Sequence, residues 1–160
     1  MGAAIEVSAY TAAPRRFVRR ARLRSDPQGV FSYVSDIARL PEWLPGVRRA
    51  TADNAAAETP GGLGAVRVLV APFGIVVRER IVAWQAPHGF AYALQDSPLA
   101  PNHLAVVTVT AERGNTLIAF EEYYDVARFP LNLFAGAIMR RAVVGMVKNL
   151  VRRFGGEALA

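Results

Sequence analysis

Three titratable side chains in the second half of the sequence could transfer protons: Tyr92, His103 and Glu122. Glu122 alternates with Ile118 and Phe120, and alternate residues of a strand lie on the same face. Because that face is the more apolar one, we expect Glu122 inside, where burial would raise the pKa of its carboxyl group and suit it to act as a general base. His103 begins a neighbouring predicted strand and could exchange protons with it. The alternative is that both lie at the solvated rim of a sheet and have no role.

Tyr92 is the third candidate and shares an apolar strand face with Phe90 and Leu94. It is therefore expected to point inward, as is Phe120, and its hydroxyl group would need a hydrogen-bond partner there. The competing interpretation is an ordinary core tyrosine.

Residues 131–154 are predicted to form one long helix that would cover these side chains. Apolar residues recur at three- and four-residue spacing and make one broad face. Arg140 lies at the border of that face. A buried guanidinium requires an anion from the protein or from a ligand, whereas an exposed one would cover the core with its stem and reach water. The candidate ligand-binding residues are Tyr92, Phe120, Glu122, Met139, Arg140, Val143 and Val147.

Shorter elements precede this helix. A strand is predicted over 17–23, and Ser25-Asp26-Pro27 then starts a short helix, with a capping side chain followed by proline at the first helical position. A second short helix begins at Pro41. Strands rich in valine and aromatic residues follow, and the short links between them predict an antiparallel meander. Their expected ranges are 47–52, 65–70, 75–85, 90–95, 103–110 and 116–126.

The composition excludes several classes of protein. There is no cysteine, and two histidines are too few for a metal site without carboxylates, so no metal or other cofactor is expected. The net charge is +6, but an exposed strand face explains the arginine cluster at 15–24, and nucleic-acid binding is not expected. No apolar run is long enough to span a membrane. Peripheral membrane contact stays open.

The N-terminal residues show no signal peptide, which predicts a cytoplasmic protein. One domain is expected over 1–160, with disorder in 1–14, because no linker or repeat divides the chain. Monomer and dimer stay open as oligomeric states.

Several local motifs resemble the SRPBCC (START-like) superfamily in its polyketide cyclase/dehydrase-like branch. They are Val30 to Asp36 (VFSYVSD), Leu40 to Val47 (LPEWLPGV), Gly61 to Gly64, Arg78 to Trp84 and Gly114 to Thr116. The resemblance implies an α+β helix-grip fold. In that fold, a curved antiparallel sheet of six to seven strands wraps around a long C-terminal helix, with two short helices near the N-terminus.

The same resemblance implies a cavity between sheet and helix that binds a hydrophobic small molecule, such as a lipid, an isoprenoid or an aromatic polyketide. Two alternatives remain. The first is a metal-free enzyme of the polyketide cyclase/dehydratase type, in which Glu122, His103 or Tyr92 moves protons. The second is a protein-interaction role like that of quinone-related or ribosome-associated relatives.

Overall fold

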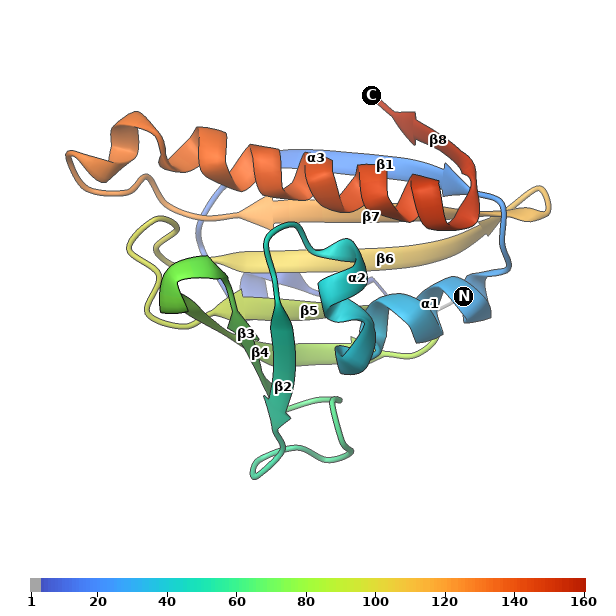
Figure 1. Cartoon of the computed structure of the whole chain (residues 1–160), viewed down its shortest axis with the longest axis horizontal. Helices are drawn as coiled ribbons and strands as arrows, with labels where there is room; N and C mark the ends of the chain where they lie inside the picture. Colours follow the sequence, from blue (N-terminus) through green and yellow to red (C-terminus); the bar gives the residue numbers. More distant parts are fainter. Residues whose placement is uncertain (1–3) are drawn as a thin grey trace.

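An antiparallel sheet of eight strands curves around a long C-terminal helix in the computed structural model, which describes residues 4–160 (Figure 1). The strand order is β2-β3-β4-β5-β6-β7-β1-β8. The strands are β1 (Arg15–Leu23), β2 (Arg49–Asp53), β3 (Val66–Val70), β4 (Val76–Gln85), β5 (Gly89–Leu94), β6 (Leu104–Glu112), β7 (Asn115–Tyr123) and β8 (Gly156–Leu159). The helices are α1 (Pro27–Ser35), α2 (Leu40–Trp43) and α3 (Ala135–Phe154), with 3-10 turns η1 (Val7–Ala9), η2 (Ile37–Arg39), η3 (Pro72–Gly74) and η4 (Leu131–Leu133).

This arrangement confirms the helix-grip prediction, with one more strand than expected. The long helix ends at Phe154, and Gly155 then turns the chain with φ 74°. The residues after it form β8, which pairs antiparallel with β1. A segment of four residues carries too little alternation to be recognised from the sequence alone.

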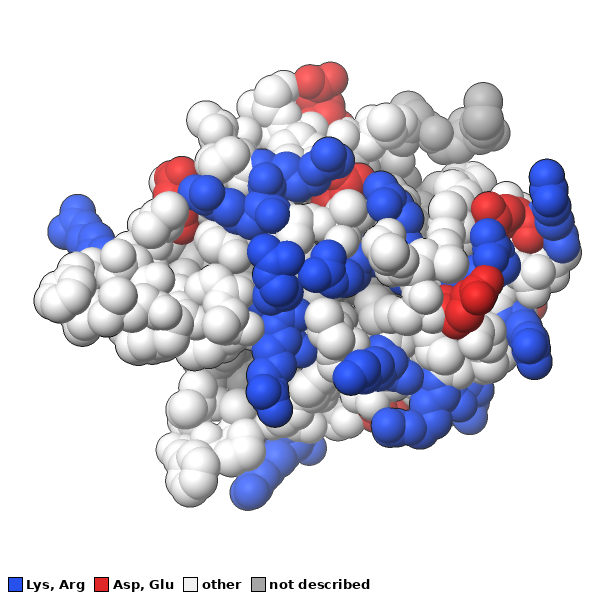
Figure 2. All heavy atoms as spheres, turned by 90° about the horizontal axis from the view of Figure 1, so that it is seen from above, with Lys and Arg blue, Asp and Glu red and all other residues white. Residues whose placement is uncertain are grey.

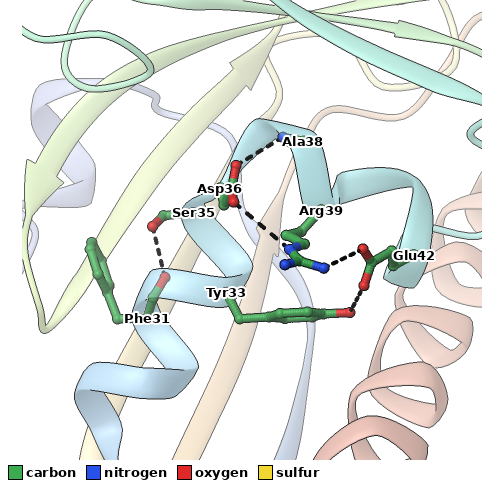
Figure 3. Close-up of polar contacts among 7 residues, drawn as sticks. All are labelled: Phe31, Tyr33, Ser35, Asp36, Ala38, Arg39 and Glu42. Atoms are coloured by element: carbon green, nitrogen blue, oxygen red, sulfur yellow. Dashed lines mark hydrogen bonds and ion pairs between the residues drawn. The ribbon is translucent and has the colours of Figure 1, made fainter.

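The corner between α1 and α2 is fixed by polar contacts (Figure 3). Asp36 accepts a hydrogen bond from the backbone N–H of Ala38 at 2.9 Å and so caps η2. Glu42 accepts hydrogen bonds from Arg39 and from the Tyr33 hydroxyl, both at 2.9 Å. These contacts hold the two short helices over the inner face of the sheet.

The inner, concave face of the sheet carries the main core, to which α1, α2 and α3 contribute. A smaller cluster lies on the outer face and includes Leu104 and Val106. Ile5 and Val7 of the N-terminal segment pack against that outer cluster. Within 1–14, where we expected disorder, the structure thus has a 3-10 turn and two side chains packed on the sheet, and residues 1–3 lie outside the described part.

Helix α3 packs by its C-terminal half. Val143, Met146, Val147 and Leu150 are buried in the main core, next to β1 and α2. The apolar spacing within residues 131–154 also placed Leu133, Gly136 and Met139 on this face. Of these, Met139 is only partly buried, and Gly136 and Leu133, which precedes the helix, are exposed. The periodicity identified the face correctly, but it does not say how far along the helix the sheet reaches.

Val143→Asp tests this packing. An unpaired carboxylate at this buried position should lower the free energy of unfolding by about 3–5 kcal/mol. The matched control is Ala142→Asp, which introduces the same charge at the exposed neighbouring position and should cost less than about 1 kcal/mol. Urea unfolding measures both. Similar losses for the two variants would contradict the assigned orientation of α3.

Candidate functional site

A cluster of polar side chains lies on the inner face of the sheet, at the end where β5 leads into β6. Antiparallel register brings it together, because Tyr92 is opposite Ala105 and Ala105 is opposite Glu122. The inward-facing residues of neighbouring strands are thus in line across β5, β6 and β7. His103 precedes β6 by one residue and shares the inward face of Ala105.

His103 and Glu122 form a buried pair. The distance from His103 Nε2 to Glu122 Oε2 is 2.8 Å, and the two side chains are 1% and 2% exposed. The backbone N–H of Leu94 donates to His103 Nδ1 at 3.2 Å. Because Nδ1 is the acceptor, we infer that a neutral ring carries its proton on Nε2 and donates it to the carboxylate.

Burial raises the pKa of the Glu122 carboxyl group, and the hydrogen bond from His103 opposes that rise. The carboxylate of Glu79 adds to the rise by repulsion. A carboxylate with a raised pKa accepts protons more readily than an exposed one, so the pair can act as a general base if a substrate reaches it.

Tyr92 ends a row of aromatic rings that leads from α1 to the pair. The ring centroids of Phe31 and Trp84, Trp84 and Phe90, Phe90 and Tyr92, and Tyr92 and His103 are 5.4, 5.7, 6.3 and 5.9 Å apart. Burial raises the pKa of the Tyr92 phenol well above its usual value, with further contributions from Glu122 and Glu79. Tyr92 is therefore a neutral hydrogen-bonding group beside His103.

Arg67 and Glu79 form a second buried pair, from β3 and β4. Arg67 Nη2 lies 2.5 Å from Glu79 Oε2, and the two side chains are 3% and 5% exposed. The guanidinium also lies over the Tyr92 ring, 4.5 Å from its centroid. Buried charges need partners of this kind, because a solitary one would be strongly destabilising.

Some donors in this interior have no partner among the described residues. Arg67 Nε and Trp43 Nε1 are buried without a hydrogen bond. The hydroxyl group of Tyr92, whose ring lies beneath the Arg67 guanidinium, makes no hydrogen bond to another described side chain. A buried donor without an acceptor costs about 1–3 kcal/mol. These groups are available to an acceptor atom supplied by a bound molecule.

A pocket of about 1340 Å³ lies at the same end of the sheet. Its walls come from the N-terminal segment, the β5–β6 loop and the segment between β7 and α3; they include Thr11, Pro98, Asn102, Asp125, Arg128 and Leu131. Leu94 and His103 belong both to this pocket and to the inner face. The pocket thus lies at the end of the sheet, whereas the sequence predicted a cavity between sheet and helix.

The structure brings together three of the predicted site residues: Tyr92, His103 and Glu122. Phe120 is buried on the same face, 6.1 Å from the Trp43 ring, and Val143 and Val147 lie in the core that covers it. Arg140 lies apart from them, exposed, with its guanidinium 4.9 Å from the centroid of the Phe17 ring. A ligand role for Arg140, Met139, Val143 or Val147 stays a prediction.

Arg67, Glu79 and the Trp43 indole were not predicted as site residues. In β3 the alternate set Val66, Val68 and Val70 is more apolar than the set containing Arg67, so the pattern favoured the wrong face. In β4 the register shifts between Ile81 and Ala83, where one residue is inserted. No spacing rule applied to the sequence places Glu79 inward across such a bulge.

Among residues 4–160, no group of three or more histidine or acidic side chains is placed to hold a metal ion. Within the same residues, no helix has both the length and the apolar character that are needed to cross a bilayer.

The sequence matches the family described as polyketide cyclase/dehydrase and lipid transport over residues 14–158. No curated protein matches the chain significantly.

Solved structures share the fold at low sequence identity. The protein XoxI from Bacillus cereus has a TM-score of 0.72 and 18% identity, over 86% of this chain and 94% of that one. The di-domain ARO/CYC protein StfQ from the steffimycin biosynthetic pathway has a TM-score of 0.65 and 15% identity, over 85% of this chain and 47% of its own. Ara h 8.0201 has a TM-score of 0.65 and 17% identity, over 86% and 95%. At such identities the likeness extends to the fold alone.

Glu122→Gln tests the electrostatics of the buried pair. Because the pKa of Glu122 is raised in the folded state, its contribution to stability is full below the ordinary value of 4.5 and is lost as pH rises through the folded pKa. The stability of the variant relative to wild type should therefore increase with pH, by about 1.4 kcal/mol for each unit by which the pKa is raised. Urea unfolding between acidic and neutral pH measures this difference.

Glu42→Gln is a control for which we expect the opposite dependence of stability on pH. The hydrogen bonds from Arg39 and Tyr33 lower the pKa of the exposed Glu42 carboxyl group, so its contribution is present above the ordinary value and is lost as pH falls. The stability of this variant relative to wild type should fall as pH rises. If the stability of Glu122→Gln relative to wild type also fell as pH rose, a raised pKa at Glu122 would be contradicted.

Proposed function

Because the chain belongs to the polyketide cyclase/dehydrase and lipid transport family, we propose that it binds a hydrophobic small molecule that carries an oxygen acceptor. The site is the interior beside Tyr92, His103 and the Arg67 guanidinium. Sites for such ligands are mainly apolar, with a few polar groups that fix orientation. The observation that carries the proposal is the buried Arg67 Nε without an acceptor, in a guanidinium that lies over the ring of Tyr92.

The surroundings favour a neutral, aromatic ligand. Phe31, Trp84, Phe90 and Tyr92 offer successive ring surfaces, and rings pack well on rings. Glu79 already neutralises Arg67, so an anionic ligand head would gain no free positive charge at this point. A carbonyl or phenol oxygen would accept from the free donors without adding charge. Among the ligand classes expected from the sequence, an aromatic polyketide fits these features better than a fatty acid.

The pair fluorenone and fluorene tests this proposal, because the two molecules share a ring system and differ in one carbonyl group. Wild-type protein should bind fluorenone more tightly than fluorene, as measured by displacement of a hydrophobic fluorophore. Tyr92→Phe should weaken fluorenone binding by roughly two- to tenfold, which corresponds to one hydrogen bond, and leave fluorene unchanged.

Tyr123→Phe is the matched control for that measurement. It removes a hydroxyl group from the same sheet, but Tyr123 packs with the outer cluster and donates to Glu121. It should leave both affinities unchanged. The absence of saturable binding for either compound would overturn the proposal, and equal losses in the two variants would remove Tyr92 from the site.

A second candidate function is catalysis, and the buried His103–Glu122 pair favours it. In an intramolecular aldol condensation, Glu122 would remove a proton from a carbon next to a carbonyl group, and the resulting enolate would attack a second carbonyl. Loss of water would then complete the ring. Tyr92 could donate a hydrogen bond to the oxygen on which negative charge develops.

Cyclisation of 2,6-heptanedione to 3-methylcyclohex-2-enone, with loss of water, is a minimal test of this candidate. An enzyme should accelerate the reaction, with a rate that rises through the raised pKa of Glu122, and Glu122→Gln should abolish that rise. Tight fluorenone binding together with no acceleration of ring closure would favour a carrier.

A further inference from the structure

Two apolar projections lie at the end of the molecule that holds the pocket. The β3–β4 turn exposes Phe73, Ile75 and Val76, with Phe73 101% exposed. The segment from the end of β7 into α3 exposes Val126, Phe129, Leu133, Phe134 and Ile138. We call these eight residues the apolar end; both projections lie at the left in Figure 1. Most large exposed apolar side chains of the described chain are thus gathered at one end, which is unusual for a surface that faces only water.

The apolar end is set in segments without acidic residues. No Asp or Glu occurs in 59–78 or in 126–156. The exposed arginines of these segments include Arg78, Arg128, Arg140 and Arg141, and none of the four forms an ion pair with a described residue. In Figure 2 the left end is mostly white and bordered by blue side chains. Asp96 and Asp125 also lie at this end, where they line the pocket.

We propose that the apolar end docks on an anionic lipid membrane. The apolar side chains project from the protein instead of lining a groove, a shape that suits insertion between lipid headgroups. The arginines beside them carry charge opposite to that of phosphatidylglycerol or phosphatidylserine, and each basic residue near such a surface strengthens binding. A protein partner would need a matching concave surface with acidic groups. The inference goes beyond ligand binding, because it requires no occupant in the interior.

Vesicle co-sedimentation of the full chain tests the proposal. Wild-type protein should bind mixed phosphatidylcholine–phosphatidylglycerol vesicles, bind pure phosphatidylcholine vesicles much more weakly, and lose affinity as salt is raised. The double variant Phe73→Asn/Leu133→Ser should bind the anionic vesicles at least about tenfold more weakly, because two side chains can no longer insert. Its thermal midpoint should match wild type, since both residues are exposed and Phe73 has φ 63°, which asparagine adopts readily.

A pair of arginine variants distinguishes binding through the apolar end from general attraction by the net charge. Arg141→Asn, in α3, should weaken binding to anionic vesicles roughly fivefold. Arg113→Asn removes the same charge from the exposed turn between β6 and β7 and should leave binding unchanged. Equal losses in the two variants would overturn the proposal in favour of nonspecific attraction by the net charge.

Three other results would also overturn it. The first is no binding to anionic vesicles, and the second is unchanged binding of the double variant. The third is a wild-type dimer in analytical ultracentrifugation that the double variant converts to a monomer, which would assign the apolar end to a second copy of the chain. Because these measurements use no small molecule, they can fail while the fluorenone experiment succeeds, and the reverse.

Discussion

The contacts that fix the C-terminal half of α3 against α2 and β1 determine how the rest of this structure is arranged. A Cβ added at Gly145 would lie 2.5 Å from Pro45 Cγ, so only glycine allows the chain after α2 to approach the helix this closely. Asn149 donates to the carbonyl oxygen of Trp43 at 3.1 Å, and β8 returns directly to β1. With this half fixed, the N-terminal half of α3 must extend towards the end of the sheet that holds the pocket. The polar cluster beside Tyr92 and the apolar end are therefore neighbours.

The interior combines two requirements that usually conflict. Its aromatic rings exclude water, which stabilises the fold, but the same exclusion makes each charge there costly. The structure meets the cost by pairing Arg67 with Glu79 and His103 with Glu122. One donor that remains unpaired, Arg67 Nε, belongs to one of these pairs. An interior of this kind is less stable than an all-apolar core would be, and the part of that difference that comes from donors without a partner could be recovered when an acceptor atom binds.

The sequence predicted the fold because its strongest signals are local and regular. Asp26-Pro27 does start α1, with the Asp26 side chain accepting from Gly29 N–H at 2.8 Å, and the alternation in β5 and β7 does place Tyr92 and Glu122 inward. Other features depend on contacts between distant segments. Whether Arg140 is buried depends on where the sheet ends beneath α3, and whether Arg67 faces inward depends on a partner in another strand. Neither can be derived from the spacing of residues within one element.

The residue inserted in β4 determines how the length of that strand can change during evolution. Ile81 pairs with Tyr92 and Ala83 with Ala91, so Val82 is the additional residue. Its presence allows both Trp84 and Glu79 to face the interior, although they are five positions apart. Replacement of Val82 by another residue would keep that arrangement. Its deletion would place Glu79 and Trp84 four positions apart in a regular strand, which also puts both side chains on the inner face and keeps Glu79 opposite Arg67. In a related sequence, β4 can therefore lose one residue at position 82 without turning either side chain outward.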